Sequence, residues 1–301
     1  MATITDDLKA RYRQGDISLR LVYINSAVFI LTWLVRVVLT LFNQSANQWM
    51  NWLELPASFK QLALQPWSLL TYMFMHADIF HILFNMLWLY WFGKLYLNFF
   101  SARHLLGLYL FGGLCGGLLY MTAYNIFPYF SEAVPYAFML GASASVLAIS
   151  IATAYRAPNY TLQLLFFGTV RLKYLALIMV LTDLLFITSN NAGGHIAHLG
   201  GALAGLWFAA SLNKGIDLTA WINKILDLVS GVFRPSAFRR KWKKPKMKVS
   251  YQSSREKDYD YNARKKAEND EIDRILDKIK KSGYGNLTDE EKKRLFDASR
   301  K

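Results

Sequence analysis

The sequence predicts an all-α polytopic membrane protein with six membrane-spanning helices, and three observations support this fold class. First, 53% of the 301 residues are hydrophobic and only 19% are charged, whereas a soluble globular protein carries about 25% charged residues. Second, six separate apolar segments approach the ~20 residues that a helix needs to cross a bilayer. Third, residues 214–301 contain 24 Lys and Arg against 14 Asp and Glu. A charge-poor body followed by a charge-rich tail is typical of a membrane domain with a water-exposed extension.

The membrane domain is expected at residues 19–213, after a cytoplasmic N-terminal segment, 1–18, in which we see no removable signal peptide. The predicted spans are 19–43, 80–101, 103–125, 137–155, 171–189 and 195–213. Some of them contain polar side chains, which are costly in hydrocarbon and are therefore expected to face protein or a water-filled cavity. They include Arg36, Asp183 and several histidines.

Lys and Arg are distributed unequally between the two sides of the predicted bundle. Most lie in the N-terminal segment, in the connections after the second and fourth spans and in the tail, while Lys60 alone lies on the opposite side. The positive-inside rule then places both termini in the cytoplasm, as an even number of spans requires.

The first outer connection, roughly 44–79, does not resemble a solvated loop. Its segments "WMNWLELPASF" and "LQPWSLLTYMFM" are aromatic and apolar, and Trp and Tyr favour the membrane interface. We therefore expect this connection to be partly helical and partly embedded in the membrane against the bundle.

The tail is predicted to have two parts. Residues 214–268 form a basic amphipathic and flexible cytoplasmic linker, whose polybasic run 238–248 is either solvated or attracted to anionic lipid, by about 1 kcal/mol per basic residue near the surface. Residues 269–301 form a small helical hairpin, in which Thr288 and Glu291 have capping-box spacing. The hairpin carries no recognisable chemistry, and its partner is unknown.

The stretch "GASAS", residues 141–145, admits two interpretations. Small residues in membrane helices commonly form packing surfaces, because they let backbones approach closely. The glycines of the third span, among them Gly112 and Gly116, fit that interpretation too. Alternatively, Ser143 or Ser145 is a nucleophile, which would require a base and oxyanion donors nearby.

The histidines could instead suggest a metal site. However, there is no His-Glu-x-x-His pattern, and the three-residue spacing of His195 and His198 is a weak signal. His76 and His195 fit better as interfacial residues near helix ends, and Asp183 as a partner of a neighbouring helix. Because Cys115 is the single cysteine, no intramolecular disulfide is possible. We predict no metal and no cofactor.

The nucleophilic interpretation gains support from the sixth span. His198 is expected at a depth comparable to that of Ser143, and Gly201 and Gly205 follow it at helical spacing. These glycines would let the sixth helix press against the small residues of the fourth, so packing and catalysis would act together. His81 and Asn85, four residues apart on one face of the second span, would supply side-chain donors.

At this point the sequence resembles the rhomboid intramembrane serine proteases over about residues 65–212. "HADIFHILFNMLWLYWFG" is similar to the family's H-x-x-x-x-H-x-x-x-N block, "GASAS" to its G-x-S-x motif, and "AHLGGALAG" to its A-H-x-x-G-x-x-x-G block. The serine motif alone is weakly specific. Three blocks in the family's order, on the second, fourth and sixth helices, are strongly specific.

The resemblance implies roles for individual residues. Ser143 would be the nucleophile and His198 the general base, without a third acidic residue. The Ser143 backbone N–H and the side chains of His81 and Asn85 would form the oxyanion hole. The implied substrates are single-span membrane proteins cut near the outer face, with the mouth of the fifth span as a gate.

Two positions depart from the family pattern. Ala144 stands where glycine commonly follows the nucleophile, and Leu147 stands where some members place a tyrosine. We still expect activity with both changes, and we expect them to influence the reaction rate and the substrate preference. Ser145 is a rival nucleophile on spacing alone.

Two other functions compete with an active protease. One is an inactive rhomboid-like protein that binds membrane clients without cleaving them, although such proteins typically lose the serine or the histidine. The other is a proton-relaying transporter or channel using Asp183 and the histidines, which predicts polar groups spread through the membrane depth. We expect no nucleic-acid partner, and the charge bias suggests a multi-pass protein of the bacterial inner (plasma) membrane.

Overall fold

The computed structural model describes residues 12, 14–164, 168–233 and 253–298. The chain divides into two compact units, residues 1–234 and 235–301, and each is described by itself. Most of the predicted N-terminal segment and the polybasic run 238–248 lie outside the described residues.

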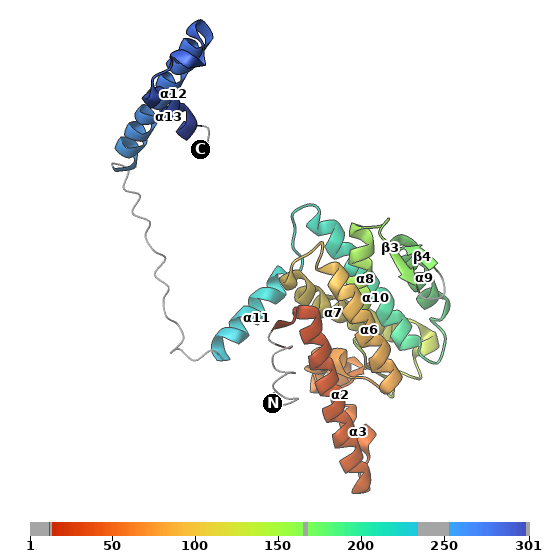
Figure 1. Cartoon of the computed structure of the whole chain (residues 1–301). Coiled ribbons are helices and arrows are strands. Elements are labelled where there is room, and N and C mark those ends of the chain that lie inside the picture. Colours follow the sequence, from red (N-terminus) through yellow and green to blue (C-terminus); the bar gives the residue numbers. More distant parts are fainter. Residues whose placement is uncertain (1–11, 13, 165–167, 234–252, 299–301) are drawn as a thin grey trace. The chain divides into compact units, whose positions relative to one another are not determined.

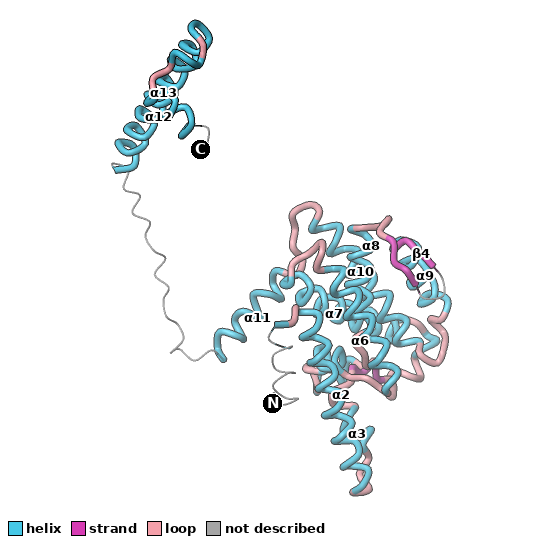
Figure 2. Tube along the Cα trace, viewed as in Figure 1, coloured by secondary structure: helices cyan, strands magenta, loops and turns pink. Residues whose placement is uncertain are grey.

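The first unit is a helical bundle with two short strand pairs (Figures 1 and 2). Its main helices are α2 (Ile17–Leu41), α6 (Ile79–Tyr96), α7 (Ala102–Ile126), α8 (Ser143–Arg156), α9 (Leu172–Leu185), α10 (Ala192–Leu212) and α11 (Ala220–Phe233). The first six of these lie at the six predicted spans. α8 and α7 are central: α8 contacts α6, α7, α9 and α10, and α7 contacts α2, α8, α10 and α11.

Among the described residues, three helices are long and apolar enough to cross a membrane: α2, α7 and α10. α6 has 18 residues, and α8 and α9 have 14 each. At 1.5 Å per residue a 14-residue helix is about 21 Å long, less than the ~30 Å hydrocarbon core. The predicted bounds of the fourth and fifth spans were therefore too long.

The fourth predicted span began at residue 137, but its first residues are not helical. Phe138 and Met139 form strand β2, which pairs antiparallel with β1 (Leu55–Pro56). Gly141 then has φ +136°, a conformation that glycine adopts far more readily than other residues. α8 therefore begins only at Ser143, after an extended segment.

The connection between α2 and α6 is partly helical, as predicted. It contains α3 (Ala46–Met50), α4 (Phe59–Leu64), α5 (Ser68–Thr71) and the 3-10 turn η1 (Tyr72–Phe74). It is tied to the bundle by buried hydrogen bonds: the Tyr72 hydroxyl donates to the Gly113 carbonyl at 2.6 Å, and the Tyr109 hydroxyl to the Met73 carbonyl at 2.9 Å. These bonds hold η1, and hence the chain entering α6, against α7.

Between α8 and α9 the chain forms a small antiparallel hairpin. Its strands are β3 (Thr161–Leu164) and β4 (Gly168–Arg171), with Thr161 opposite Arg171. The described fold is thus mainly helical with two minor strand pairs, rather than all-α.

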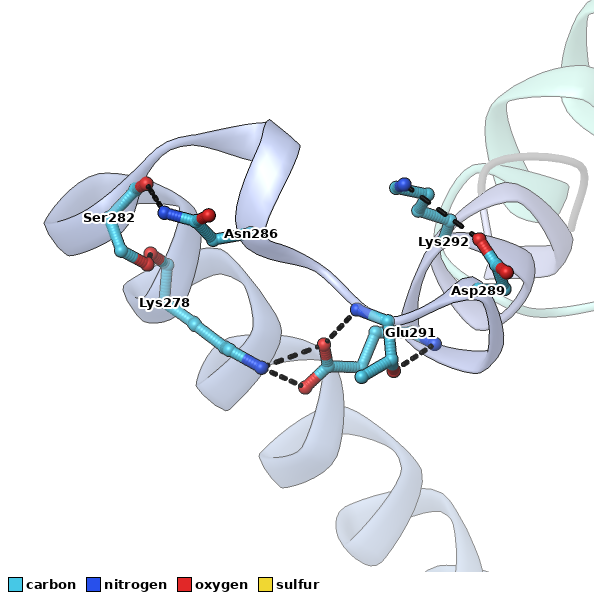
Figure 3. Close-up of polar contacts among 7 residues, drawn as sticks. Lys278, Ser282, Asn286, Asp289, Glu291 and Lys292 are labelled. Atoms are coloured by element: carbon cyan, nitrogen blue, oxygen red, sulfur yellow. Dashed lines mark hydrogen bonds and ion pairs between the residues drawn. The ribbon is translucent and has the colours of Figure 1, made fainter.

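The second unit contains α12 (Ser253–Ser282), the 3-10 turn η4 (Tyr284–Asn286) and α13 (Asp289–Ala298). The capping box is confirmed: Glu291 Oε2 accepts from the Thr288 N–H at 2.8 Å, and the Thr288 hydroxyl accepts from the Glu291 N–H at 3.3 Å. Lys278 of α12 also binds both Glu291 carboxylate oxygens at 2.9 Å (Figure 3). Residues 253–268, which the sequence assigns to a flexible linker, are helical and belong to α12.

Candidate functional site

Ser143 occupies the first position of α8. The backbone N–H groups of a first helical turn have no acceptor within the helix, so they can stabilise an anion placed there. The preceding Gly141 N–H donates to the Tyr72 carbonyl at 2.9 Å, which fixes the turn that leads into Ser143. The serine hydroxyl therefore lies next to free backbone donors.

His198, on α10, contacts this serine directly. Its Nε2 lies 2.6 Å from the Ser143 Oγ, a short hydrogen-bond distance between side chains 55 residues apart in the sequence. The half-buried imidazole is thus in position to accept the hydroxyl proton. The structure brings together the two residues that the sequence motifs select.

Asp183, on α9, contacts the other nitrogen of the same ring. Its Oδ1 lies 2.7 Å from His198 Nδ1 and 2.8 Å from His195 Nδ1. The carboxylate is buried, although an Asp at the centre of a spanning helix costs about 2.5–3.5 kcal/mol to insert. Asp183 thus bonds to the neighbouring helix α10, as the sequence interpretation expected, and one of its two partners there is His195.

The hydrogen bonds are compatible with the tautomer of His198 that an ionised Asp183 would select. An ionised carboxylate can only accept, so the Nδ1 of His198 carries a proton when it bonds Asp183. In the neutral ring Nε2 is then unprotonated, and it accepts the hydrogen bond from the Ser143 hydroxyl. This is the protonation state that a general base requires.

Glycines set the separation between α8 and α10. A Cβ added to Gly201 would overlap the carbonyl oxygen of Ala144, and one added to Gly205 would overlap that of Ala148. The two helices consequently pack backbone to backbone, as expected for small residues at a membrane-helix interface. This close packing allows the Ser143 and His198 side chains to meet.

The methyl group of Ala144 faces α7. A Cβ added to Gly116 of α7 would lie 2.7 Å from the Ala144 Cβ, so Gly116 provides the space that this methyl occupies. Because residues 112 and 148 are paired in the same way, α8 lies between glycine pairs of α7 and α10. Alanine at position 144 therefore does not narrow the space around Ser143.

His81 and Asn85 are placed by the start of α6. Asp78 caps this helix by accepting from the His81 N–H at 2.9 Å, and His81 Nδ1 accepts from the Ala77 N–H at 3.3 Å. With Nδ1 as an acceptor, the proton of the neutral ring is on Nε2. Asn85 donates one amide hydrogen to the His81 carbonyl at 2.9 Å.

His81 Nε2 and the Ser143 hydroxyl face the same small space beside Gly141. A Cβ added to Gly141 would lie 3.1 Å from His81 Nε2 and 3.5 Å from Ser143 Oγ. The absence of a side chain thus leaves room there for a substrate oxygen. His76 supports this arrangement by packing edge-on against His81, with ring centroids 5.1 Å apart. Burial lowers the pKa of His76 to about 4, so this ring is neutral at physiological pH.

A largely apolar cavity of about 430 Å³ opens onto Ser143, His198 and Asn85. The rest of its wall comes from α6, α8 and α9 and includes Trp88, Leu147, Met179 and Asp183. Leu147 contributes apolar surface where a tyrosine would contribute a hydroxyl.

The two serines of "GASAS" differ in environment. Ser145 is 1% exposed, and its hydroxyl has no hydrogen-bond partner within the part of the chain that the structure describes. Only Ser143 combines a base within hydrogen-bond distance with access to the cavity. The feature that the sequence interpretation missed is Asp183 as a partner of His198. Its only sequence signal was its position as the one carboxylate in the fifth span.

Asp183, His195 and His198 also present one oxygen and two nitrogens within 4.8 Å of one another. This donor set is compatible with a divalent cation such as Zn²⁺. In the present arrangement, however, both Nδ1 atoms hydrogen-bond to a single carboxylate oxygen.

Comparison with known proteins gives two family matches. A Rhomboid domain model matches residues 63–214, and a family of unknown function, DUF6576, matches residues 255–301. The chain is also 35% identical over 211 residues to RHOMBOID-like protein 12, mitochondrial, of Arabidopsis thaliana, covering 66% of this chain and 59% of that relative. The chain thus spans less than two thirds of the length of this curated relative.

Proposed function

Because the chain belongs to the rhomboid family, we propose that it is an intramembrane serine endopeptidase that cleaves spanning segments of membrane proteins. The observation that carries the proposal is the 2.6 Å contact between Ser143 Oγ and His198 Nε2. A hydroxyl bonded to an imidazole beside free helix N–H groups is the arrangement that acyl transfer requires.

The reaction follows from this geometry in two stages. Ser143 Oγ attacks the scissile carbonyl carbon while its proton passes to His198 Nε2, and the carbonyl oxygen becomes an oxyanion. The Ser143 N–H, His81 Nε2–H and the free amide hydrogen of Asn85 are the proposed donors to that oxyanion. The intermediate collapses, the C–N bond breaks, and the imidazolium protonates the leaving amine. Water, deprotonated by His198, then hydrolyses the acyl-enzyme and releases Ser143.

The cavity indicates the substrate class and its route of entry. Its apolar wall between α6 and α9 suits a membrane segment, and we propose single-span proteins that unwind near the outer face as substrates. In this proposal six helices cross the bilayer. The short α8 begins within the membrane depth, and the α2–α6 connection is embedded in the outer leaflet.

The charge distribution supports both termini on the cytoplasmic side of a multi-pass membrane protein. We propose the bacterial inner membrane as its location, with the polybasic run 238–248 available to anionic lipid. The name of the Arabidopsis relative places that protein in mitochondria. Accessibility of single cysteines introduced near each terminus, measured in intact cells, tests the topology.

The alternative is a rhomboid-like protein that binds membrane clients without cleaving them. The name of the relative, "RHOMBOID-like", leaves its activity open. The intact contact between Ser143 and His198 favours the protease, because a client-binding protein has no need of a hydrogen-bonded nucleophile and base.

The test is cleavage of a reconstituted single-span reporter by the purified full-length protein. We expect Ser143→Ala and His198→Ala to lower the rate by at least 10³-fold. Ser145→Ala, the matched control, should retain activity because its hydroxyl lies away from the cavity. Equal cleavage by wild type and Ser143→Ala would refute the proposal, as would complete loss in Ser145→Ala alone. Binding of the reporter without any cleavage would favour the client-binding alternative.

A further inference from the structure

We infer that Asp183 is a positioning residue that extends the proposed Ser143–His198 pair into an Asp183–His198–Ser143 triad, with His195 anchoring the carboxylate. This inference rests on the proposed protease function and deepens it. The resemblance alone implied a pair without an acidic member.

The first support is the continuity of the hydrogen bonds. Asp183 Oδ1 is 2.7 Å from His198 Nδ1, and His198 Nε2 is 2.6 Å from Ser143 Oγ. The three groups come from α9, α10 and α8, so their contacts are not a consequence of proximity in the sequence. A carboxylate on Nδ1 holds the ring in the tautomer that leaves Nε2 able to accept a proton, and it stabilises the imidazolium that then forms.

The second support is the placement of Asp183 on its helix. α9 buries only Leu172 and Asp183, whereas Leu177, Ile178, Leu181, Leu184 and Leu185 are exposed. The one residue buried within the body of this apolar helix is therefore a carboxylate, and it faces the proposed base. A leucine would suit a packing position better.

The third support is His195. Its Nδ1 lies 2.8 Å from the same oxygen that bonds His198, so two rings on one helix hold one carboxylate oxygen from both sides. His195 has no contact with Ser143 in the described structure, and its effect on the reaction must pass through Asp183. Substitution of Asp183 should therefore lower kcat more than substitution of His195.

The test compares Asp183→Asn, Asp183→Glu and His195→Phe in the full-length protein, measuring kcat and KM separately. We expect Asp183→Asn to lower kcat about 10²- to 10⁴-fold with KM changed less than threefold. The kcat of Asp183→Glu should be at least tenfold higher than that of Asp183→Asn. His195→Phe should lower kcat about three- to tenfold. Leu181→Ala, an exposed neighbour on α9, is the matched control and should retain wild-type values.

Two outcomes would overturn the inference while leaving the protease intact. One is an Asp183→Asn enzyme whose kcat is within threefold of wild type while Ser143→Ala and His198→Ala are inactive. The other is an Asp183→Asn enzyme that loses activity through KM alone, which would assign Asp183 to substrate entry. If Ser143→Ala itself cleaves normally, the protease proposal fails first.

A second measurement does not depend on the stability of the Asp183 and His195 variants. Nitrogen-15 spectra of histidine-labelled Ser143→Ala protein at neutral pH report which ring nitrogen of His198 carries the proton. Protonated Nδ1 is expected, and a ring protonated on Nε2 alone would overturn the inference. Loss of wild-type activity in a chelator, restored by Zn²⁺, would assign the three residues to a metal instead and would equally overturn it.

Discussion

α8 and α9 are neighbouring helices of equal length, yet they are held in very different ways. From Ala144 to Ala154 every residue of α8 is buried, whereas α9 buries only Leu172 and Asp183. α8 is enclosed by glycines of α7 and α10 at backbone distance. α9 contacts α8 and α10 through a small apolar cluster of Leu147, Ile151 and Ala202.

This difference divides the site into two parts. The Ser143–His198 contact joins α8 and α10, whose packing distance is determined by backbone atoms that cannot rearrange. Asp183 and one wall of the cavity belong to α9, which buries few of its own side chains and is held to α10 by the hydrogen bonds of Asp183. Ser143 and His198 are therefore held by backbone packing, while Asp183 lies on a helix that is held mainly by side-chain contacts.

Separating α8 from α10 should disrupt the site more than any other change. Gly201→Val would place a side chain against the Ala144 carbonyl, and the helices would have to move apart. A displacement of about 1 Å can cost 10²-fold in rate, so we expect at least a 10²-fold loss of kcat and a lower Tm. Gly231→Ala, at an exposed position with open space around it, is the control and should leave both unchanged or raise Tm slightly. Wild-type kcat in Gly201→Val would show that this packing does not position the site.

A double-mutant cycle tests the α7 side of the same helix. Gly112→Ala would overlap the methyl of Ala148, while the next nearest atom is 3.4 Å away. We expect Gly112→Ala to lower stability by about 1–3 kcal/mol, and Gly112→Ala/Ala148→Gly to recover part of it. Thermal unfolding in detergent measures both, and a double variant no more stable than additivity predicts would contradict the pairing.

Leu147→Ala tests whether α9 can be loosened by itself. It removes the centre of the cluster that joins α9 to α8 and α10, without touching the glycine contacts. We expect amide hydrogen exchange in α9 to speed up about tenfold or more, while α8 and α10 change little. The exposed substitution Leu181→Ala provides the baseline. Equal acceleration in all three helices would show that they open as one unit.

The smallest expected effect is in the C-terminal hairpin. Hydrogen bonds from Lys278 and Thr288 hold the pKa of Glu291 below its ordinary value of 4.5. The resulting stabilisation is fully present above pH 4.5 and is lost as pH falls through the lowered pKa. In full-length protein, Glu291→Gln should remove this pH dependence from amide exchange in α13, changing protection by tenfold or less and leaving cleavage unchanged. An unaltered pH dependence in the variant would contradict this role for Glu291.

Much of the fold and the site could be predicted because the signals are local. Apolar runs placed six helices, Thr288 and Glu291 predicted a capping box that forms, and motif spacing selected Ser143 and His198, which lie in contact. Polarity alone did not reveal the helix at residues 253–268, because a charged helix and a flexible linker have similar composition. Length misled at residue 137, since an apolar segment does not reveal that its first part pairs as a strand.

The residue pattern alone selects the candidates for the proposed chemistry: a serine among small residues, a histidine followed by two glycines, and the His81–Asn85 pair. The pattern does not show that Asp183 binds His198 or that the Ala144 methyl faces Gly116, and both contacts are seen only in the folded bundle. The physical reason is that hydrogen bonds and side-chain contacts between helices depend on the rotation and separation of each helix. Those quantities are determined by the packing of the whole bundle, which no single segment encodes.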